Sequence, residues 1–337
     1  MPTTFSQHTR LFAVSVYVAD PLENRYNATP MTLREFLLLL AAFGGLSSGL
    51  SVSAAAAAER KTASAAEIAA AKKTWDSWNT PVPPFRIIGN VHYVGASGVS
   101  SFLITTPQGH ILLDTGFEST VPRIQESVTK LGFRLADIKL LLSSHAHLDH
   151  TGGHARMKEL TGASIVMSEA DAALLASGGA NDFPPNESGM MNYRPAKAER
   201  LVRDGQKVTL GDTTLVCHLS PGHTKGCTSW SMEVTDNGAV HHVVFFGSTT
   251  ILTGVPLVNN AKYPEIANDL KKTYQTLKAL PCDVFLAPHA GFFGMAEKVE
   301  RMQSGKANPF VEPGEFRAYL VKAEKNFLEQ LAAEQGK

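Results

Sequence analysis

Four histidines and one aspartate lie within the stretch SSHAHLDHTGGH, residues 143 to 154. The whole chain of 337 residues has 12 histidines, so a third of them fall in this segment. His145 and His147 are two positions apart, and an extended backbone places both side chains on the same side. Asp149 and His150 follow where the chain turns into a helix. Imidazole and carboxylate groups in this arrangement are suitable ligands for a metal ion.

Two further histidines follow apolar strands and lie next to glycine and proline. His223 lies in SPGHTKG and His289 lies in LAPHAG. A hydrolase with two metal ions needs several neutral imidazoles, at least one carboxylate and an open position for water. Strands that end in these turns would present both histidines to the same cleft as residues 145 to 150. The sequence therefore predicts a two-metal hydrolytic site.

The other histidines are interpreted as ordinary core or surface residues, because a lone histidine rarely binds metal. These are His8, His92, His110, His218, His241 and His242. His154 lies one helical turn beyond His150, and it is also interpreted as a residue that binds no metal.

Short strands and helices position these residues in the first half of the chain. The expected strands are 85–95, 99–106, 110–116, 138–147 and 163–171, and the last but one runs directly into the histidine cluster. The expected helices are 119–133, 152–162 and one within 59–84. Residues 176–198 are rich in Gly, Pro and Asn and form a long loop, a kind of segment that is often functional. Residues 183–193 and Trp78 are candidate pocket walls, although Trp78 fits a core position equally well.

The second half repeats this pattern. The expected strands are 207–220 (a pair), 228–234, 241–248 and 282–291, with a helix at 264–280 and an amphipathic helix at the end of the chain. Two runs of strands, each followed by helices, predict an α/β fold in which two sheets pack face to face with helices outside.

Composition limits the classes of function. Apolar residues make up 44% and charged residues 18%, which is typical of a globular protein. The 31 basic and 31 acidic side chains give a net charge of zero, which does not favour nucleic-acid binding. No long apolar stripe is left after the core is assigned, so we expect a monomer without stable membrane association.

The N-terminal segment has the pattern of an export signal. Residues 31–58 carry one basic residue, Arg34, then an apolar run and five alanines. We therefore expect a cleaved signal peptide at 31–58, a mature chain that begins near Ala58 or Glu59, and a single catalytic domain at 59–337. Residues 1–30 are interpreted as an upstream or non-native extension, since Met31 is a plausible start. Export permits disulfides, and Cys217 with Cys227 is one possible pair, while free buried thiols remain the alternative.

The motif HAHLDH matches the HxHxDH signature of the metallo-β-lactamase superfamily, and LLDTG, PGHT and PHAG occur in that family's order. The chain therefore resembles this superfamily over about residues 85–293. The resemblance implies an αββα sandwich with two zinc ions at one edge. It implies one zinc ligand set of His145, His147 and His223, and a second of Asp149, His150 and His289. Asp114 resembles an aspartate that orients the ligands, or it is a simple turn former.

Ser248 distinguishes among the hydrolases of this superfamily. Many members place a bridging aspartate in a strand-end GD motif, whereas this chain has VVFFGSTTIL. A neutral hydroxyl is a weaker ligand and cannot replace that carboxylate. Serine at this position resembles class B β-lactamases of the third subclass. Ser248 and Thr250 resemble residues that contact the substrate carboxylate, although both also suit an ordinary strand-end turn.

The resemblance implies a mechanism and a location. A hydroxide shared by the zinc ions attacks the lactam carbonyl, and Asp149 holds it in line. The substrate is a small-molecule β-lactam, carbapenems included, which implies antibiotic resistance, and the exported enzyme acts in the periplasm. The alternatives are another hydrolase of the superfamily, such as a lactonase or thioesterase, or a zinc-binding protein without activity.

Overall fold

The computed structural model describes residues 64–336, apart from 185, 187, 304 and 306. These residues belong to a compact unit that spans Glu59–Lys337. The expected extension at 1–30, the signal peptide at 31–58 and His8 lie outside the described residues. Within the described part of the chain, no helix is long and apolar enough to cross a bilayer.

The first sheet has seven strands that lie side by side in chain order. They are β1 (Phe85–Ile88), β2 (Val91–Tyr93), β3 (Phe102–Thr106), β4 (Gly109–Leu113), β5 (Ile138–Leu142), β6 (Ser164–Ser168) and β7 (Arg200–Val202). Strands β1 to β4 pair antiparallel through short turns. Strands β4 to β7 pair in parallel, because a helix connects β4 to β5 and β5 to β6.

The second sheet has five strands in the order β12-β11-β10-β9-β8. They are β8 (Lys207–Leu210), β9 (Thr213–Leu219), β10 (Thr228–Asp236), β11 (Ala239–Phe245) and β12 (Val284–Leu286). Strands β8 to β11 pair antiparallel, whereas β12 pairs with β11 in parallel after a helical crossover.

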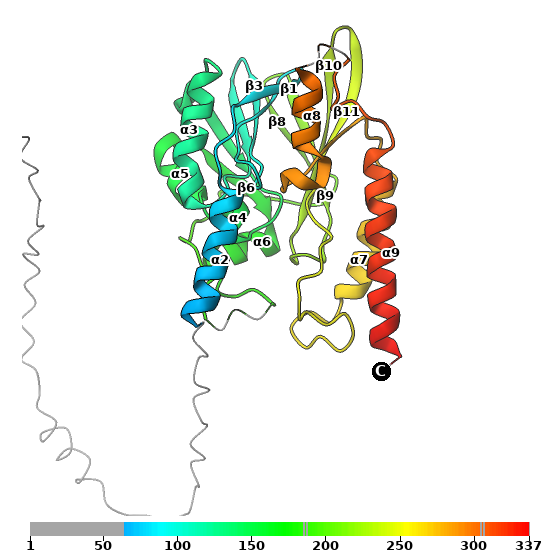
Figure 1. Cartoon of the computed structure of the whole chain (residues 1–337). Helices are drawn as coiled ribbons and strands as arrows, with labels where there is room; N and C mark the ends of the chain where they lie inside the picture. Colours follow the sequence, from blue (N-terminus) through cyan, green and yellow to red (C-terminus); the bar gives the residue numbers. More distant parts are fainter. Residues whose placement is uncertain (1–63, 185, 187, 304, 306, 337) are drawn as a thin grey trace, which may run out of the picture. The chain divides into compact units, whose positions relative to one another are not determined.

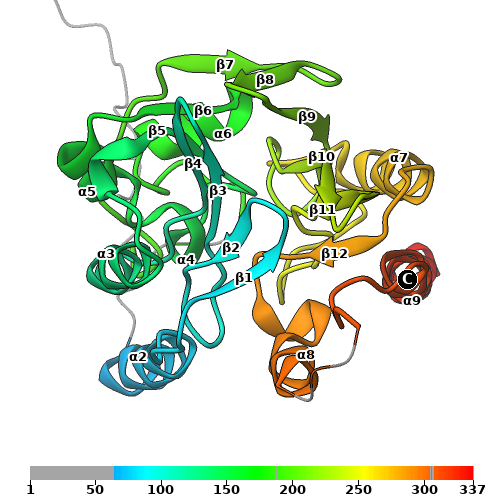
Figure 2. The ribbon, with the colours of Figure 1, turned by 90° about the horizontal axis from the view of Figure 1, so that it is seen from above.

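Helices cover the outer faces of both sheets (Figure 1; Figure 2). The α-helices of the described residues are α2 (Ala65–Trp78), α3 (Val121–Lys130), α4 (Leu148–Thr151), α5 (His154–Thr161), α6 (Glu169–Ala176), α7 (Ile266–Lys278), α8 (Met295–Met302) and α9 (Glu315–Gln335). Figure 2 shows α3 and α5 beside the first sheet and α7 and α9 beside the second. The expected sandwich of two mixed sheets between helices is therefore confirmed.

Alternate residues of the central strands face two different hydrophobic cores. Phe102 and Ile104 of β3 pack in the core between the sheets with Trp230 of β10. Leu103, between them in sequence, faces the opposite side and packs with Ile124 of α3. Because both faces are buried, this sheet holds the ends of its strands rigidly, and those ends carry the candidate site.

Several parts of the sequence differ from the expected elements. The run at 85–95 is the hairpin of β1 and β2, and β7 was not expected. Residues 163–171 were expected to form one strand, but β6 ends at Ser168 and α6 begins at Glu169. The apolar part of this stretch ends at Met167, and the acidic residues that follow lie in the first turn of α6, where they favour the helix. Helix α8 was not expected from the sequence. All three cysteines lie in the described part of the chain and are free thiols, so the possible Cys217–Cys227 disulfide is absent.

Candidate metal centre

The ends of three strands bring the predicted metal ligands together. His145 and His147 follow β5, and Asp149 and His150 lie on the short helix α4. His223 lies in the turn between β9 and β10 of the other sheet. His289 follows β12, and its backbone forms an isolated antiparallel bridge with Val99. Both sheets therefore contribute ligands along one edge of the sandwich.

Among the described residues, the structure forms two groups with the geometry of metal ligands. One group is His145, His147 and His223, and the other is Asp149, His150 and His289. One ligand atom from each residue lies within 4.8 Å of those from the other two members of its group. The rings of His145 and His150 are 4.3 Å apart between centroids, so the two groups are adjacent. These are the same two sets that the family resemblance implies.

Each of four histidines has one ring nitrogen close to a hydrogen-bonding partner. His223 Nδ1 lies 2.6 Å from the Thr250 carbonyl oxygen, and His289 Nδ1 lies 3.3 Å from that of Gly98. His145 Nδ1 lies 3.1 Å from the Ser144 hydroxyl. A histidine held through one nitrogen presents the other in a fixed direction, as metal-binding histidines do.

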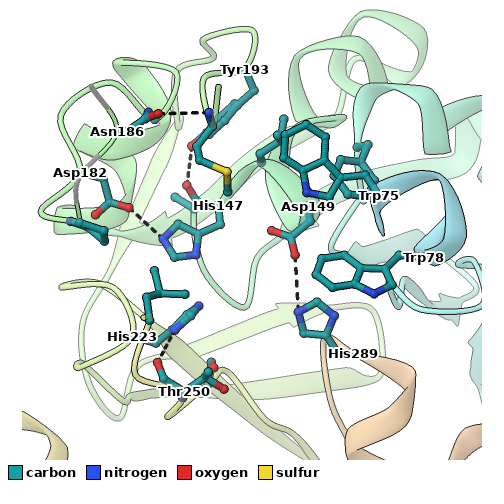
Figure 3. Close-up of a pocket in the computed structure, with 18 of the residues that line it drawn as sticks. Trp75, Trp78, His147, Asp149, Asp182, Asn186, Tyr193, His223, Thr250 and His289 are labelled. Carbon is teal, nitrogen blue, oxygen red and sulfur yellow. Dashed lines mark hydrogen bonds and ion pairs between the residues drawn. The ribbon is translucent and has the colours of Figure 1, made fainter. Parts of the chain in front are cut away.

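The fourth of these histidines is held by a residue that the sequence did not reveal. His147 Nε2 lies 2.8 Å from a carboxylate oxygen of Asp182, which leaves Nδ1 toward the other two histidines of its group (Figure 3). Asp182 lies in the long loop between α6 and β7, 35 positions from its partner. The functional character of that loop was expected, but no local motif marked this aspartate.

Asp149 stands at the centre of the second group. Its Oδ2 lies 3.2 Å from His150 Nε2. The same oxygen lies 3.5 Å from His289 Nε2 (Figure 3). Burial by itself would raise the pKa of Asp149, but His150 and His289 hold that pKa far below its ordinary range. The carboxylate is therefore ionised at neutral pH and can serve as the anionic ligand of a metal ion.

Burial keeps three of the imidazoles in the neutral form that binds metal. It lowers the pKa of His145 and of His223 well below the ordinary value, and neighbouring histidines add to this effect. Burial and the nearby His150 lower the pKa of His289 to about 4. Metal ligands must be deprotonated, so these groups are ready to bind a cation without first losing a proton.

Asp114 lies behind the ligands, in the place that the family resemblance implies. It is fully buried, and its Oδ1 accepts a hydrogen bond of 2.8 Å from the Ser144 amide, next to His145. Its Oδ2 lies 3.9 Å from His150 Nδ1. The backbone of Asp114 has φ of 60°, a left-handed conformation that is uncommon outside glycine. Such conformations cluster at functional sites, where the surrounding structure maintains them.

Asp171 joins the turns that carry the first group. Its carboxylate accepts hydrogen bonds from the Ala146 amide (2.8 Å), the Thr224 hydroxyl (3.0 Å) and the Gly226 amide (3.0 Å). Ala146 lies between two of the histidines, and Thr224 follows His223. One buried side chain on α6 therefore fixes a turn from each sheet, and no local sequence motif marks it.

The two groups fit metal ions by the chemistry of their donors. His145 Nε2 is buried and has no hydrogen-bond partner among the described residues. The His145 ring contacts the rings of His147 and His223 edge-on. A buried ring nitrogen without a partner is costly unless a cation or water occupies the space. Five imidazoles and one ionised carboxylate are ligands that suit zinc.

A pocket of about 440 Å³ opens onto both groups. His147, Asp149, His223 and His289 form its base, and its walls are mostly apolar. The wall residues include Trp75, Trp78, Phe117, Leu148, Met191, Tyr193 and Phe292. Trp78 and part of the 183–193 loop therefore line the pocket as expected, whereas Phe183 itself packs in the core against Tyr263. Ser248 and Thr250 also line this pocket.

The histidines interpreted as structural lie outside the two groups. His154 is buried and its two ring nitrogens lie 2.8 Å from the Thr115 hydroxyl and 2.9 Å from the Ser143 hydroxyl. His92 and His110 pack edge-on against Phe133, and His218 and His242 bond to nearby polar side chains. Among the described residues, neither metal-like group includes any of them.

Comparison with known proteins identifies the family. Residues 94–289, more than half of the chain, match the family described as the metallo-beta-lactamase superfamily. The chain belongs to this superfamily. Its fold and its buried histidine groups indicate a metal-dependent hydrolase.

Solved metallo-beta-lactamases have the same fold. The FEZ-1 enzyme of Legionella gormanii is 39% identical, with a TM-score of 0.76 over 77% of this chain and 99% of that chain. BJP-1 of Bradyrhizobium japonicum, a subclass B3 enzyme, is 41% identical, with a TM-score of 0.72 over 77% and 97%. The class B3 di-zinc enzyme LRA-12 from an Alaskan soil metagenome is 34% identical, with a TM-score of 0.72 over 76% and 96%.

Curated relatives by sequence have other names. A UPF0173 metal-dependent hydrolase of Anaeromyxobacter is 26% identical over 63% of this chain and 69% of its own length. The N-acyl homoserine lactonase AttM of Agrobacterium fabrum is 29% identical over 41% of this chain and 61% of its own length. These matches support the superfamily and a hydrolytic site, and they do not distinguish among its reactions.

Proposed function

We propose that this protein is a zinc-dependent β-lactamase that hydrolyses the amide bond of penicillins, cephalosporins and carbapenems. The observation that carries the proposal is the number of carboxylates at the metal centre. Among the described residues, Asp149 and Asp182 are the acidic residues that line the pocket, and Asp182 is engaged by His147. Ser248 lies at the position of the bridging aspartate in many other hydrolases of the superfamily, so Asp149 is left as the single anionic ligand. The solved β-lactamases with the same fold support this choice.

The six ligands would hold two zinc ions, with His145, His147 and His223 on the first and Asp149, His150 and His289 on the second. When bound, zinc ions polarise a carbonyl and lower the pKa of water to about 7, which supplies a nucleophile at neutral pH. The second carboxylate oxygen of Asp149 can accept a hydrogen bond from the attacking water and hold it in line with the lactam carbonyl.

Ser248 and Thr250 would bind the substrate carboxylate at the other side of the centre. Ser248 Oγ accepts a hydrogen bond of 3.2 Å from the Thr250 amide, which leaves its hydroxyl proton free to donate. The apolar walls near Trp75, Trp78 and Phe117 would cover the substrate and exclude bulk water. Both effects position the amide bond over the metal centre.

A lactonase is the second candidate. The sequence similarity to AttM favours it, and a mostly apolar pocket also suits an acyl chain. The neutral Ser248 argues against it, because the lactonases and thioesterases of the superfamily carry a carboxylate at this position. We further propose export through a signal peptide at 31–58 and action in the periplasm, where β-lactams reach their targets and hydrolysis confers resistance.

The test is hydrolysis of imipenem and of a cephalosporin by residues 59–337, first with added zinc and then with EDTA. Fast turnover that EDTA abolishes is the expected result. Asp149→Ala and His223→Ala should each lower kcat/KM by about 100-fold or more with an unchanged circular dichroism spectrum. An acyl homoserine lactone, assayed in parallel, tests the second candidate. A folded, zinc-loaded protein that opens the lactone but no β-lactam would overturn the proposed function.

A further inference from the structure

A second cavity of about 510 Å³ lies next to the metal-centre pocket. Thr250, Gly291 and Phe292 line both spaces. Phe292 lies between the two, since its ring centroid is 5.2 Å from that of His289 in an edge-on contact and 5.7 Å from that of Tyr319 in a tilted contact. A Cβ atom added at Gly291 would meet no heavy atom within 4 Å, so the backbone there faces open space. The junction between the two cavities is therefore not blocked at this glycine.

The second cavity differs from the first in chemistry. Its wall comes largely from α9, and it offers the Lys322 ammonium group, the Asn326 amide and the Tyr319 phenol beside the aromatic ring of Phe327. The described residues that line the metal-centre pocket include no lysine or arginine. Lys322 forms no ion pair with the described residues, and the nearby Glu324 is engaged by Lys278 at 2.6 Å. An uncompensated positive charge therefore borders this cavity.

The geometry of bicyclic β-lactams relates the two cavities. Their carboxylate and the main substituent of the second ring are attached to neighbouring ring carbons. A carboxylate bound at Ser248 and Thr250 would therefore place that substituent close to Thr250. Thr250 is one of the three residues that line both the metal-centre pocket and the second cavity.

We propose that the second cavity is a subsite for the substituent next to the β-lactam carboxylate, with a preference for large substituents that end in an anionic or hydrogen-bond-accepting group. The inference rests on the proposed β-lactamase function and adds a substrate preference to it. The aromatic ring of Tyr319 contacts the body of the substituent, and Lys322 attracts its anionic end.

The test compares cephalosporins with the same acyl group and different C3 substituents: methyl, a large anionic heterocycle and a large cationic heterocycle. Asn326→Trp places a bulky ring at the cavity from an exposed position on α9. We expect kcat/KM for both large substituents to fall about tenfold, mainly through KM, while the methyl substrate changes less than about twofold. Val321→Trp is the matched control, since Val321 is exposed on the same helix but does not line the cavity.

Reversing the charge of Lys322 tests whether the second cavity prefers an anionic substituent. Lys322→Glu should raise KM about threefold or more for the anionic substrate and lower it for the cationic substrate, because exposed charges contribute modestly. Lys325→Glu makes the same change in net charge on α9 outside the cavity, and it should affect neither substrate.

The outcomes separate this inference from the function on which it rests. If the wild-type protein hydrolyses all three substrates and Asn326→Trp slows them equally or not at all, the subsite is wrong and the β-lactamase function stands. If the zinc-loaded wild-type protein hydrolyses none of them, the proposed function is overturned and the subsite with it.

Discussion

At the scale of single residues, Asp182 fixes the orientation of the His147 ring. The carboxylate at 2.8 Å from Nε2 fixes which ring nitrogen faces the other two histidines. Carboxylate partners of this kind also raise the basicity of a metal-bound imidazole. Because Asp182 belongs to the loop that lines the pocket, the same loop contributes both a wall for the substrate and an orienting group for the metal centre.

Asp182→Asn should weaken zinc binding by about 10- to 100-fold, since the amide keeps the size of the side chain but loses its charge. Competition with a chromophoric chelator measures the affinity directly, independent of turnover. Asn181→Ala, an exposed neighbour in the same loop, is the control and should bind zinc as the wild type does. Equal affinities for Asp182→Asn and the wild type would contradict the role assigned to this carboxylate.

Ser248→Asp should lower the rate of β-lactam hydrolysis by about tenfold or more, because a second carboxylate reduces the electrophilic character of the metal pair. Steady-state kinetics with imipenem gives the rate. Ser248→Ala removes the hydroxyl without adding charge, and comparison of the two variants isolates the electrostatic effect. An unchanged rate in Ser248→Asp would show that this position does not determine the reaction.

Some residues of the candidate site could be predicted from the sequence and others could not, and the reason is physical. The two histidine-rich groups were visible because their members follow apolar strands and are chemically unusual there. Their assignment to zinc stays a prediction. Asp182 and Asp171 were not visible, because each acts on a ligand loop that is distant in sequence. An aspartate in a loop or on a helix is too common for its type alone to indicate such a contact.

At the scale of elements, His154 connects the ends of two central strands. Its ring bridges Thr115, just after β4, and Ser143, just after β5. Burial lowers its pKa to about 3, so it is neutral in the folded protein. It therefore supports the strand ends that carry Asp114 and His145 without adding charge next to the metal centre.

The contribution of His154 to stability should depend on pH. The pKa of His154 is about 6.5 in the unfolded chain and about 3 in the folded protein, so between these pH values the unfolded state binds more protons. The stabilising contribution of neutral His154 is therefore complete above pH 6.5, and it is lost as the pH falls toward 3. His154→Gln should cost about 1–3 kcal/mol at pH 7 and less at pH 5. Urea denaturation of metal-free wild type and variant at both pH values gives the difference. A gap that stays constant or widens at pH 5 would contradict the neutral state of His154.

Element boundaries were harder to predict than the elements themselves. Ser168 and Glu169 interrupt the apolar run at 163–171 where β6 ends and α6 begins, a helix-start signal that the expected single strand did not take into account. Helix α8 begins directly after Gly294, whose φ of 60° ends the preceding helical turn. That turn depends on tertiary contacts near His289, which a local sequence pattern does not contain.

At the scale of the whole molecule, the ligands come from both sheets. The first sheet supplies His145 to His150, and the second supplies His223 and His289. The sandwich could be predicted from two runs of strands because each run buries its own apolar faces. The alignment of the two sheets could not be predicted, since it depends on contacts such as the bond of 2.9 Å from Trp230 Nε1 to the Ser143 carbonyl.

Processing of the full chain is a further prediction at this scale. Expression from Met31 in a bacterium with a periplasm should yield an exported protein whose N-terminus lies near Ala58 or Glu59. N-terminal sequencing of the periplasmic fraction identifies the cleavage point. A variant with Leu38 and Leu39 changed to Arg should remain in the cytoplasm at full length. Detection of the uncleaved wild-type chain in the cytoplasm would contradict the proposed localisation.

The positions of the three tryptophans have one further consequence. Trp75 and Trp78 line the pocket, and the Trp78 ring lies 5.1 Å edge-on from the His289 ring. Trp230 is fully buried between the sheets. Indole emission responds to nearby charge and to water, so two of the three emitters are placed where a bound ion or ligand changes their surroundings, while the third supplies a steady background. The protein thus carries an intrinsic fluorescent reporter of its own metal centre.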